Sequence, residues 1–376
     1  MPAMTELSHS TLAAAAAAAA AALPKVLLHE HLDGSLRVAT LLELLRARGV
    51  TPPADDVEAL SRWFDGNANA GSLERYLQAF ALTVAAMASP DALRRVAFEA
   101  AEDARAQGTL LAEFRIAPLL FEPYGLSGDV VVEALLEGLS ASALQTEMKS
   151  GMKSGMRTGM QCGLIVCALR HESAAAVSRA AALAQRWFER TRAARVGVIG
   201  FDLAGAERGH PPAEHLWALA LAREAGLPLT LHAGEADDAE RVLEAGRLGA
   251  RRIGHGVRLI DALNDPARAH LIEEVKARGL HLEVCPTSNV HTGAAASIAA
   301  HPITALWRAG ISLSYHTDNT LMSRISHNSE AASLLAHTPL TEVDLLQMAL
   351  AAARASFLPE AQRAPVIEKL QAATAA

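Results

Sequence analysis

The feature that most constrains the fold is a series of eight short apolar runs, separated by segments rich in alanine and leucine. Short apolar runs bounded by polar segments predict buried strands. They cover residues 25–31, 109–116, 163–169, 196–203, 228–232, 252–255, 281–285 and 311–315. From the third run onward they are spaced by roughly 30 residues, the length of one strand–helix–strand unit. Eight strands alternating with helices predict an α/β fold, a (β/α)8 barrel of the TIM type.

The segments between the runs have helical character. Residues 91–106 and 174–190 are rich in alanine with scattered charges, and residues 212–224 end just before Gly226, a suitable helix C-cap. A doubly wound sheet is the alternative, but no G-x-G-x-x-G motif follows the first run. Residues 36–108 are long enough for extra helices between the first two strands. In a barrel we expect them on the active-site face, where they shape or cover the pocket.

Composition and charge limit the classes of function. The 376 residues carry a net charge of −7 without a long basic run, which argues against partners such as nucleic acid or a membrane surface. The three cysteines are too few for a disulfide framework, so we expect a cytoplasmic protein. Residues 1–22 form a low-complexity, alanine-rich N-terminal extension that lacks the basic start of a secretory signal. We predict a single catalytic barrel domain over residues 23–376.

A four-residue repeat of the type Lys-Ser-Gly-Met occupies residues 149–163. Its glycine and serine content predicts a flexible surface loop. Because the repeat leads into the third strand, we expect this loop at the end of the barrel away from the chemistry. A methionine surface for a partner protein is the alternative.

Polar side chains lie where several of the runs end. They are His29, His31, His232, Glu235, His255 and Asp318. Residues two apart in a strand point to one face, so the first two histidines project together. Imidazole groups suit zinc, iron, copper or nickel. Because the carboxyl ends of all barrel strands converge on one face, we expect the six side chains to meet there.

Five motifs, in this order, resemble the adenosine deaminase family of metal-dependent hydrolases: His-Glu-His-Leu-Asp-Gly, His-Ala-Gly-Glu, Arg-Ile-Gly-His-Gly, Cys-Pro-Thr-Ser-Asn and Thr-Asp-Asn. The resemblance extends from about Leu23 to about Phe357. It implies hydrolysis of adenosine and 2′-deoxyadenosine to inosine and ammonia, in purine salvage. It implies one zinc ion bound by His29, His31, His232 and Asp318. It also implies Glu235 as proton donor and His255 beside the metal-bound water. The residues implied around the nucleoside are His31, Asp33, Gly205 and Asn319.

The chemistry requires the same types of residue. Deamination at C6 of a purine needs a hydroxide at neutral pH and a proton for the ring. Zinc lowers the pKa of a bound water from 15.7 to about 7, and three imidazoles with one carboxylate leave a position open for that water. Glu235 follows His232 by three residues and is expected to protonate N1. The His-x-Glu and Pro-Cys-x-x-Cys signature of cytidine-type deaminases is absent from the sequence.

Three residues bear on substrate choice. Asp33 is expected to accept a ribose hydroxyl, although a turn residue before Gly34 is the alternative. Gly205 lacks a side chain, which allows its backbone to approach purine N3. Asn319 departs from the family, many of whose members carry a second aspartate there. An amide donates to N7 while neutral, so purine recognition remains possible and the fine specificity stays open.

Other activities remain as alternatives. One is deamination of adenine or of a modified adenosine, but relatives that act on adenine tend to carry Glu in place of Asp33. Another is a non-catalytic purine-binding relative, which is expected to have lost Glu235 or a metal ligand. A two-metal hydrolase is disfavoured because no lysine stands at the end of the fourth strand.

A few further side chains have more ordinary expected roles. We expect Glu30 to point away from the metal towards a basic neighbour, and Cys285 to be a buried, inert thiol. His316 is expected near the site without contacting the metal. No role is predicted for the histidines that lie beside helices and loops, which are His171, His210 and His215.

Overall fold

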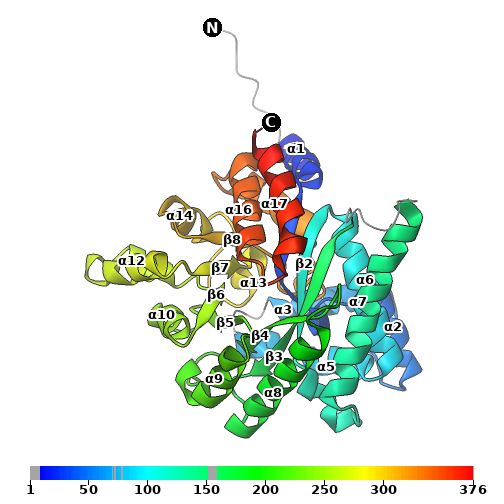
Figure 1. Cartoon of the computed structure of the whole chain (residues 1–376). Coiled ribbons are helices and arrows are strands. Elements are labelled where there is room, and N and C mark those ends of the chain that lie inside the picture. The colour runs from blue at the N-terminus through cyan, green and yellow to red at the C-terminus, as the bar shows by residue number, and fades with distance from the viewer. Residues whose placement is uncertain (1–8, 70, 72, 78, 151–158, 376) are drawn as a thin grey trace.

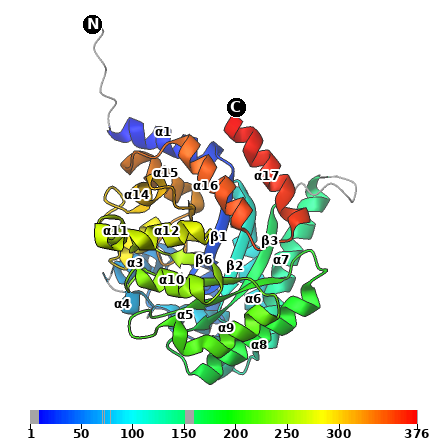
Figure 2. The ribbon, with the colours of Figure 1, turned by 60° about the vertical axis from the view of Figure 1, so that its left-hand side comes forward.

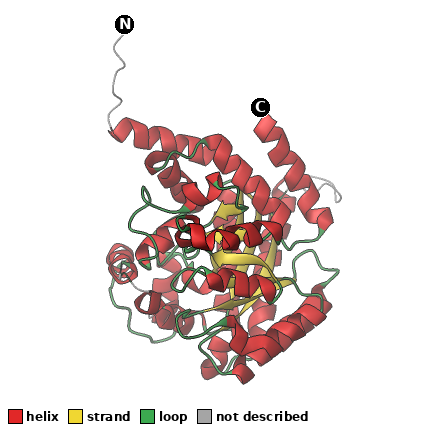
Figure 3. Ribbon diagram, turned by 90° about the vertical axis from the view of Figure 1, so that its left-hand side faces the viewer, coloured by secondary structure: helices red, strands yellow, loops and turns green. Residues whose placement is uncertain are grey.

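Eight parallel strands form one sheet, in which each strand pairs with its neighbours in sequence order. The computed structural model describes residues 9–69, 71, 73–77, 79–150 and 159–375. The strands are β1 Lys25–His31, β2 Thr109–Ile116, β3 Gln161–Leu169, β4 Val198–Ala204, β5 Leu229–Ala233, β6 Ala250–His255, β7 His281–Val284 and β8 Leu313–Tyr315. They lie at the centre of the molecule with helices around them (Figures 1 and 3). The predicted (β/α)8 barrel is confirmed, and each strand begins and ends within two residues of its predicted run.

The barrel closes between β8 and β1 through the segment that follows β8. The backbone N–H of Asp318 donates to the carbonyl of His29 at 2.9 Å, and the N–H of His31 donates to the carbonyl of Asp318 at 2.8 Å. Glu30 and Asp318 form an isolated parallel bridge there. This closure therefore fixes Asp318 beside both histidines of β1 through the backbone alone.

Helices connect the strands and cover the outside of the barrel. The α-helices are α1 His9–Ala22, α2 Val38–Ala47, α3 Val57–Ala68, α4 Leu73–Leu77, α5 Phe80–Met87, α6 Pro90–Ala106, α7 Gly128–Ser150, α8 Ala174–Thr191, α9 Leu216–Glu224, α10 Glu240–Arg247, α11 Leu259–Leu263, α12 Ala269–Ala277, α13 Pro286–His291, α14 Ile303–Arg308, α15 His327–His337, α16 Glu342–Ala355 and α17 Glu360–Ala375. Four 3-10 helices are η1 Leu32–Gly34, η2 Pro118–Tyr124, η3 Pro212–His215 and η4 Pro266–Arg268. None of the helices within the described ranges combines the length and apolar character needed to cross a membrane.

Local sequence signals explain where several helices begin and end. The hydroxyls of Ser89 and Ser173 accept the backbone N–H groups of Ala92 and Ala176, which caps α6 and α8. After α9 the chain leaves the helix at Gly226, whose φ of +75° is the left-handed conformation predicted for this position. The predicted helical segments are thus all helical in the structure, with η3 preceding α9 in the third.

The described residues of the long interval between β1 and β2 form helices α2 to α6, as predicted for residues 36–108, and Figure 2 labels α3 to α6 of these. Their apolar faces join the main core between strands and helices, through side chains such as Leu41, Phe64 and Leu93. A second, smaller core lies where α16 and α17 pack against the start of the barrel, and it includes Val26 and Phe357.

The two low-complexity segments differ in what the structure describes. Residues 9–22 of the N-terminal extension form helix α1, which lies against α15 and buries Ala20. In the repeat at 149–163, helix α7 ends at Ser150 and β3 begins at Gln161. Residues 151–158, on which the prediction of a flexible surface loop falls, lie outside the described residues.

Candidate metal centre and active site

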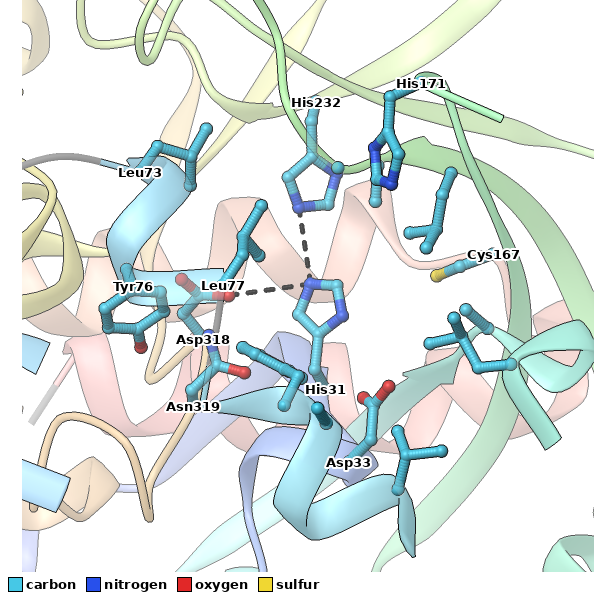
Figure 4. Close-up of a pocket in the computed structure, with 18 of the residues that line it drawn as sticks. His31, Asp33, Leu73, Tyr76, Leu77, Cys167, His171, His232, Asp318 and Asn319 are labelled. Atoms are coloured by element: carbon cyan, nitrogen blue, oxygen red, sulfur yellow. Dashed lines mark hydrogen bonds and ion pairs between the residues drawn. The ribbon is translucent and has the colours of Figure 1, made fainter. Parts of the chain in front are cut away.

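Three histidines and one aspartate meet at the carboxyl ends of the strands. His29 and His31 lie at the end of β1, His232 in β5, and Asp318 beyond β8. One donor atom from each lies within 4.8 Å of the donor atoms of the other three. Nε2 of His31 is 3.3 Å from Nε2 of His232 and 3.5 Å from Oδ1 of Asp318 (Figure 4). Nε2 of His29 lies 3.3 Å from the same oxygen and makes no hydrogen bond within the described part of the chain.

Two buried carboxylates fix the protons of these imidazoles. Glu283 Oε2 lies 2.8 Å from Nδ1 of His29, and Asp202 Oδ1 lies 3.1 Å from Nδ1 of His232. Carboxylates accept here, so each ring carries its proton on Nδ1 and turns the lone pair of Nε2 towards the cluster. Lone pairs that converge at these distances repel one another unless a cation lies among them. The donors present therefore fit a metal ion.

The charge state of the cluster is also that of a metal site. Burial alone would raise the pKa of Asp318, but positive charge on the surrounding rings of His29, His255 and His31 would hold it well below its ordinary value, and a bound cation would do the same beside neutral rings. Ser288 Oγ donates to Oδ2 of this carboxylate at 2.6 Å. Burial lowers the pKa of His31 well below its usual value, so this ring is neutral. Neutral imidazoles with one carboxylate form a donor set that suits zinc in catalytic sites.

A buried network of charges supports the cluster from inside the barrel. Arg115 donates to Asp202 at 2.8 Å and to Glu283 at 2.6 Å. Arg252 lies 2.6 Å from both Glu283 and Glu113. All five side chains are buried, and paired charges avoid the large cost of an isolated buried ion. This network was not predicted from the sequence. Charged residues two positions apart within an apolar run, as in β2, would have indicated charged side chains on one face of the strand.

A chain of directed hydrogen bonds fixes the proton of His255. The backbone N–H of Ile303 donates to Nδ1 of His301 at 3.0 Å, so Nε2 of that ring carries a proton and donates to Oδ1 of Asn289 at 3.3 Å. The Asn289 amide nitrogen then donates to Nδ1 of His255 and to Oε1 of Glu235, both at 3.1 Å. His255 therefore carries its proton on Nε2, which lies 3.6 Å from Oε2 of Glu235. This assignment follows from the network of donors and acceptors.

Glu207 holds the loop that presents Glu235. Its buried carboxylate accepts the backbone N–H groups of residues 234–237, and three of these bonds are 3.0, 2.7 and 3.1 Å long. Thr292 Oγ1 donates to Oε1 of Glu235 at 2.8 Å, and Arg258 Nε donates to its backbone carbonyl at 3.1 Å. The loop is thus fixed through its backbone as well as its side chain. No pattern in the sequence pointed to Glu207.

The backbone is strained at two of the site residues. His255 and Asp318 have φ values of +65° and +60°, in the left-handed region that side chains other than glycine rarely adopt. Within the described ranges Arg324 is the one further residue of this kind. Such strain persists where the surrounding structure imposes it, and it concentrates at functional sites.

A cavity of about 390 Å³ opens over the cluster (Figure 4), which is within the range of small-molecule sites. Its floor contains His31, His232, His255, Glu235 and Asp318. Apolar side chains of α4, α5 and η2 form much of its wall: Leu73, Leu77, Phe80, Val84 and Leu120. The inserted helices therefore shape the pocket, as predicted from the length of the interval. No lysine or arginine is among the described residues that line the cavity.

The four expected substrate residues, His31, Asp33, Gly205 and Asn319, line the same cavity, and the carboxyl and amide side chains among them each have an unpartnered oxygen. Oδ1 of Asp33 and Oδ1 of Asn319 are buried without a hydrogen bond in the described residues. Burial raises the pKa of Asp33 to about 7. A Cβ at Gly34 would lie 1.8 Å from Oδ1 of Asn319, so glycine is required for the amide to occupy its place. Gly205 has a φ of +89°, and a Cβ there would lie 2.8 Å from Nδ1 of His171.

His171 lines the cavity beside Gly205 (Figure 4), although no role was predicted for it. Glu30 points away from the cluster as expected, but the expectation of a basic neighbour was wrong. Thr317 Oγ1 donates to its carboxyl group at 2.8 Å, and burial raises the pKa of Glu30 to about 8. A carboxyl group that is largely neutral at pH 7 does not need a cation, which explains the difference.

His316 and Cys285 lie behind the cluster. Nδ1 of His316 accepts the backbone N–H of Leu28 at 3.1 Å, so this ring supports β1 without being one of the four clustered donors. Sγ of Cys285 is close to donor atoms of His255 and Asp318. Burial raises the pKa of this thiol well above its ordinary value, as is typical of a buried cysteine.

Comparisons with known proteins agree with this geometry. A family model described as adenosine deaminase matches residues 24–373. An adenosine deaminase from Mycobacterium tuberculosis is 41% identical over 355 residues, which covers 92% of this chain and 93% of that protein. Two solved structures are also similar. Arabidopsis ADAL complexed with IMP has a TM-score of 0.77 at 25% identity, covering 95% of this chain and 98% of its own. An adenine deaminase from Arthrobacter aurescens has a TM-score of 0.78 at 24% identity, covering 94% and 100%.

Proposed function

The chain belongs to the adenosine deaminase family of hydrolytic deaminases, and we propose that it hydrolyses adenosine to inosine and ammonia, and 2′-deoxyadenosine to 2′-deoxyinosine and ammonia, with one zinc ion. One observation carries the proposal: the cluster of four converging metal donors, the carboxylate of Glu235 and two side chains that each have an unpartnered oxygen meet at the same cavity. The proposal includes a role in purine salvage and a single catalytic domain over residues 23–376. It also includes a cytoplasmic location, in which the three free, buried cysteines remain reduced.

His29, His31, His232 and Asp318 would hold the metal ion. When bound, zinc supplies a Lewis acid that brings the pKa of a water molecule to about 7. The chain's own groups prepare the position. Glu283 and Asp202 keep two imidazoles in the tautomer that offers Nε2, and burial keeps His31 neutral.

Glu235 and His255 act on the protons of the reaction. Nε2–H of His255 is available as a donor that orients the attacking water, because Asn289 occupies Nδ1. Glu235 is proposed to deliver a proton to N1 of the purine ring as C6 becomes tetrahedral. Asn289 and Thr292 both donate to Oε1 of Glu235, which leaves Oε2 on the side of His255.

The lining of the cavity supports a nucleoside as the substrate. Asp33 has an unpartnered oxygen that can accept a ribose hydroxyl. The amide nitrogen of Asn319 is the group that would donate to N7. The backbone at Gly205 lies open because no side chain covers it. A nucleotide would bring a phosphate group into a cavity whose described lining contains no lysine or arginine, so its charge would be left unpaired. The apolar wall from α4 and α5 would cover the ring and exclude water.

The test follows the ultraviolet absorbance of adenosine after mixing with the protein. We expect the spectrum of inosine to appear, and we expect a strong chelator to abolish the change until zinc is restored. Adenine, AMP and N6-methyl-AMP are the comparison substrates under the same conditions. Turnover of adenine but not adenosine would replace our choice of substrate. No ammonia release from zinc-loaded protein with any of these compounds would instead support a non-catalytic purine-binding role.

A further inference from the structure

A second cavity lies at the opposite end of the barrel from the candidate active site. Its volume is about 380 Å³, and it opens beside the first residues of β6 and β7 and the residue preceding β8. Its polar lining consists of Arg251, Arg278, Arg354, His281 and Ser312, and we call it the arginine pocket. Arg278 directly follows α12, and Arg354 lies within α16. Figure 1 shows both helices on the side of the barrel that carries β6 to β8.

The arginine pocket carries an excess of positive charge. No aspartate or glutamate is among the described residues that line it. Arg278 donates to Glu274 at 2.8 Å, but this carboxylate is shared with Arg247. Arg251 and Arg354 have exposed side chains and form no ion pair with any residue in the described ranges. On a chain whose net charge is −7, three guanidinium groups around one recess without an acidic side chain form a localised cationic site.

A chain of directed hydrogen bonds ends in this pocket. It begins at the backbone N–H of Leu28, which donates to Nδ1 of His316 at 3.1 Å. The His316 ring must then carry its proton on Nε2, which donates to Ser314 Oγ at 2.7 Å. Oγ of Ser314 lies 2.8 Å from Nε2 of His281, and Nδ1 of His281 lies 2.9 Å from Ser312 Oγ. We assign the His281 proton to Nδ1, because the ring then accepts from the Ser314 hydroxyl and donates to Ser312. As a result the hydroxyl proton of Ser312 is left free to bind an acceptor in the pocket.

The burial of His281 makes this polarity stable. The ring is only 2% exposed, and burial with the nearby Arg252 lowers its pKa to about 3. A neutral imidazole has one donor and one acceptor, so the two hydrogen bonds of His281 can reverse only together, and the Ser314 hydroxyl would then lose His281 as its acceptor. The pocket therefore presents guanidinium groups and an oriented hydroxyl, all of which are donors.

We propose that the arginine pocket binds phosphate, either as the free anion or as the phosphate group of a small ester. Arginine pairs with phosphate through two parallel hydrogen bonds and keeps its charge at all physiological pH values. The hydroxyl of Ser312, an exposed residue in the lining of the pocket, adds a donor to the guanidinium groups. The site is separate from deamination, because the catalytic side chains lie at the other ends of the strands.

The test is isothermal titration calorimetry of the zinc-loaded full chain at constant ionic strength, with inorganic phosphate, ribose 5-phosphate and ATP as titrants. We expect saturable binding of at least one titrant. The titrant that binds most tightly shows whether the pocket prefers the free anion or a phosphate ester. Arg354→Ala and Arg251→Ala should each raise the dissociation constant of that titrant about tenfold, which corresponds to the loss of one charge-assisted contact. Arg354→Lys should retain part of the affinity, and Ser312→Ala should lower it by a smaller factor.

Two controls separate this site from the catalytic cavity. Asp33→Ala alters the candidate purine pocket and should leave phosphate binding unchanged. Arg62→Ala removes an exposed arginine from α3, and we expect it to leave phosphate binding unchanged. That result would exclude a general loss of surface charge as the cause of weaker binding in the pocket variants. Absence of saturable binding for all three titrants overturns the proposal. Binding that survives both Arg354→Ala and Arg251→Ala but is lost in Asp33→Ala overturns it as well.

Discussion

The two ends of the barrel hold cavities of nearly equal volume, about 390 and 380 Å³, with opposite chemistry. At the carboxyl ends of the strands the polar lining includes imidazoles and carboxyl groups, which bind cations and exchange protons, together with one amide, two phenols and a thiol. At the amino ends it consists of guanidinium groups, one imidazole and a hydroxyl, which bind anions. In both, a backbone N–H starts a chain of hydrogen bonds, from Ile303 to His255 at one end and from Leu28 to Ser312 at the other.

What separates the two cavities is the buried network of charges in the barrel. Arg115 and Arg252 alternate with Asp202, Glu283 and Glu113 across its interior. Burial alone would raise the pKa of Glu283, but the two arginines hold it well below its ordinary value. The network is therefore ionised and internally paired. Each cavity can be changed by mutation without altering the paired charges between them, so the difference between the ends is open to direct tests.

The largest expected effect comes from Glu235→Gln. The amide keeps the size of the side chain and can still accept from Asn289 and Thr292, but it cannot deliver a proton as the acid does. We expect kcat to fall by about a thousandfold, which is within the range for removal of a general acid. Zinc content by mass spectrometry and phosphate binding at the arginine pocket should match the unaltered protein. Retention of more than a tenth of kcat would remove Glu235 from the role of proton donor.

Much of the fold was predictable because its signal is local. The eight runs are short, apolar and evenly separated, and they match the strands to within two residues. That His29, His31, His232 and Asp318 meet follows from one rule, since parallel barrel strands end on the same face. The closure of the barrel at Asp318 adds a detail that no pattern indicates, because it depends on backbone hydrogen bonds between the first and last strands.

What remained hidden depends on contacts between distant segments. Glu207 follows β4, yet its carboxylate binds the backbone of the loop after β5. Nothing in its own neighbourhood marks it as different from a surface glutamate. The arginine pocket takes side chains from β6, from the end of α12 and from α16, so its members are not close in sequence. The error at Glu30 has a related cause, since burial neutralises its carboxyl group and a hydroxyl suffices as its partner.

An intermediate effect is expected for Glu207→Ala, which tests whether the catalytic end depends on its backbone as well as its side chains. Four N–H groups in residues 234–237 would lose their acceptor, and an unsatisfied buried donor costs about 1–3 kcal/mol. We expect the loop to shift and kcat to fall by about tenfold or more, with KM changed far less. Glu207→Asp retains the charge and should recover part of kcat.

A different result would reassign Glu207. If Glu207→Ala lowers the thermal unfolding temperature but leaves kcat intact at a temperature where the variant is folded, the residue is structural. Phosphate binding at the arginine pocket serves as the folding control, because that site lies at the far end of the strands. Loss of phosphate binding together with kcat would show that the two ends are not independent.

The smallest of these effects is expected for Asn319→Ala, which tests substrate recognition at the catalytic end. The amide lies in the cavity with its oxygen unpartnered, and Gly34 leaves the space that it needs. Loss of one hydrogen bond to a neutral group costs about 1 kcal/mol, so KM for adenosine should rise by about fivefold to tenfold. Zinc content should change less than KM, because Asn319 is not one of the four clustered donors. Asn319→Asp is the matched variant: if its carboxyl group must be protonated to donate to N7, its KM should rise with pH, whereas the KM of the unaltered protein should not follow that rise. An unchanged KM in Asn319→Ala would remove this residue from purine recognition and leave Asp33 and Gly205 as the groups that select the substrate.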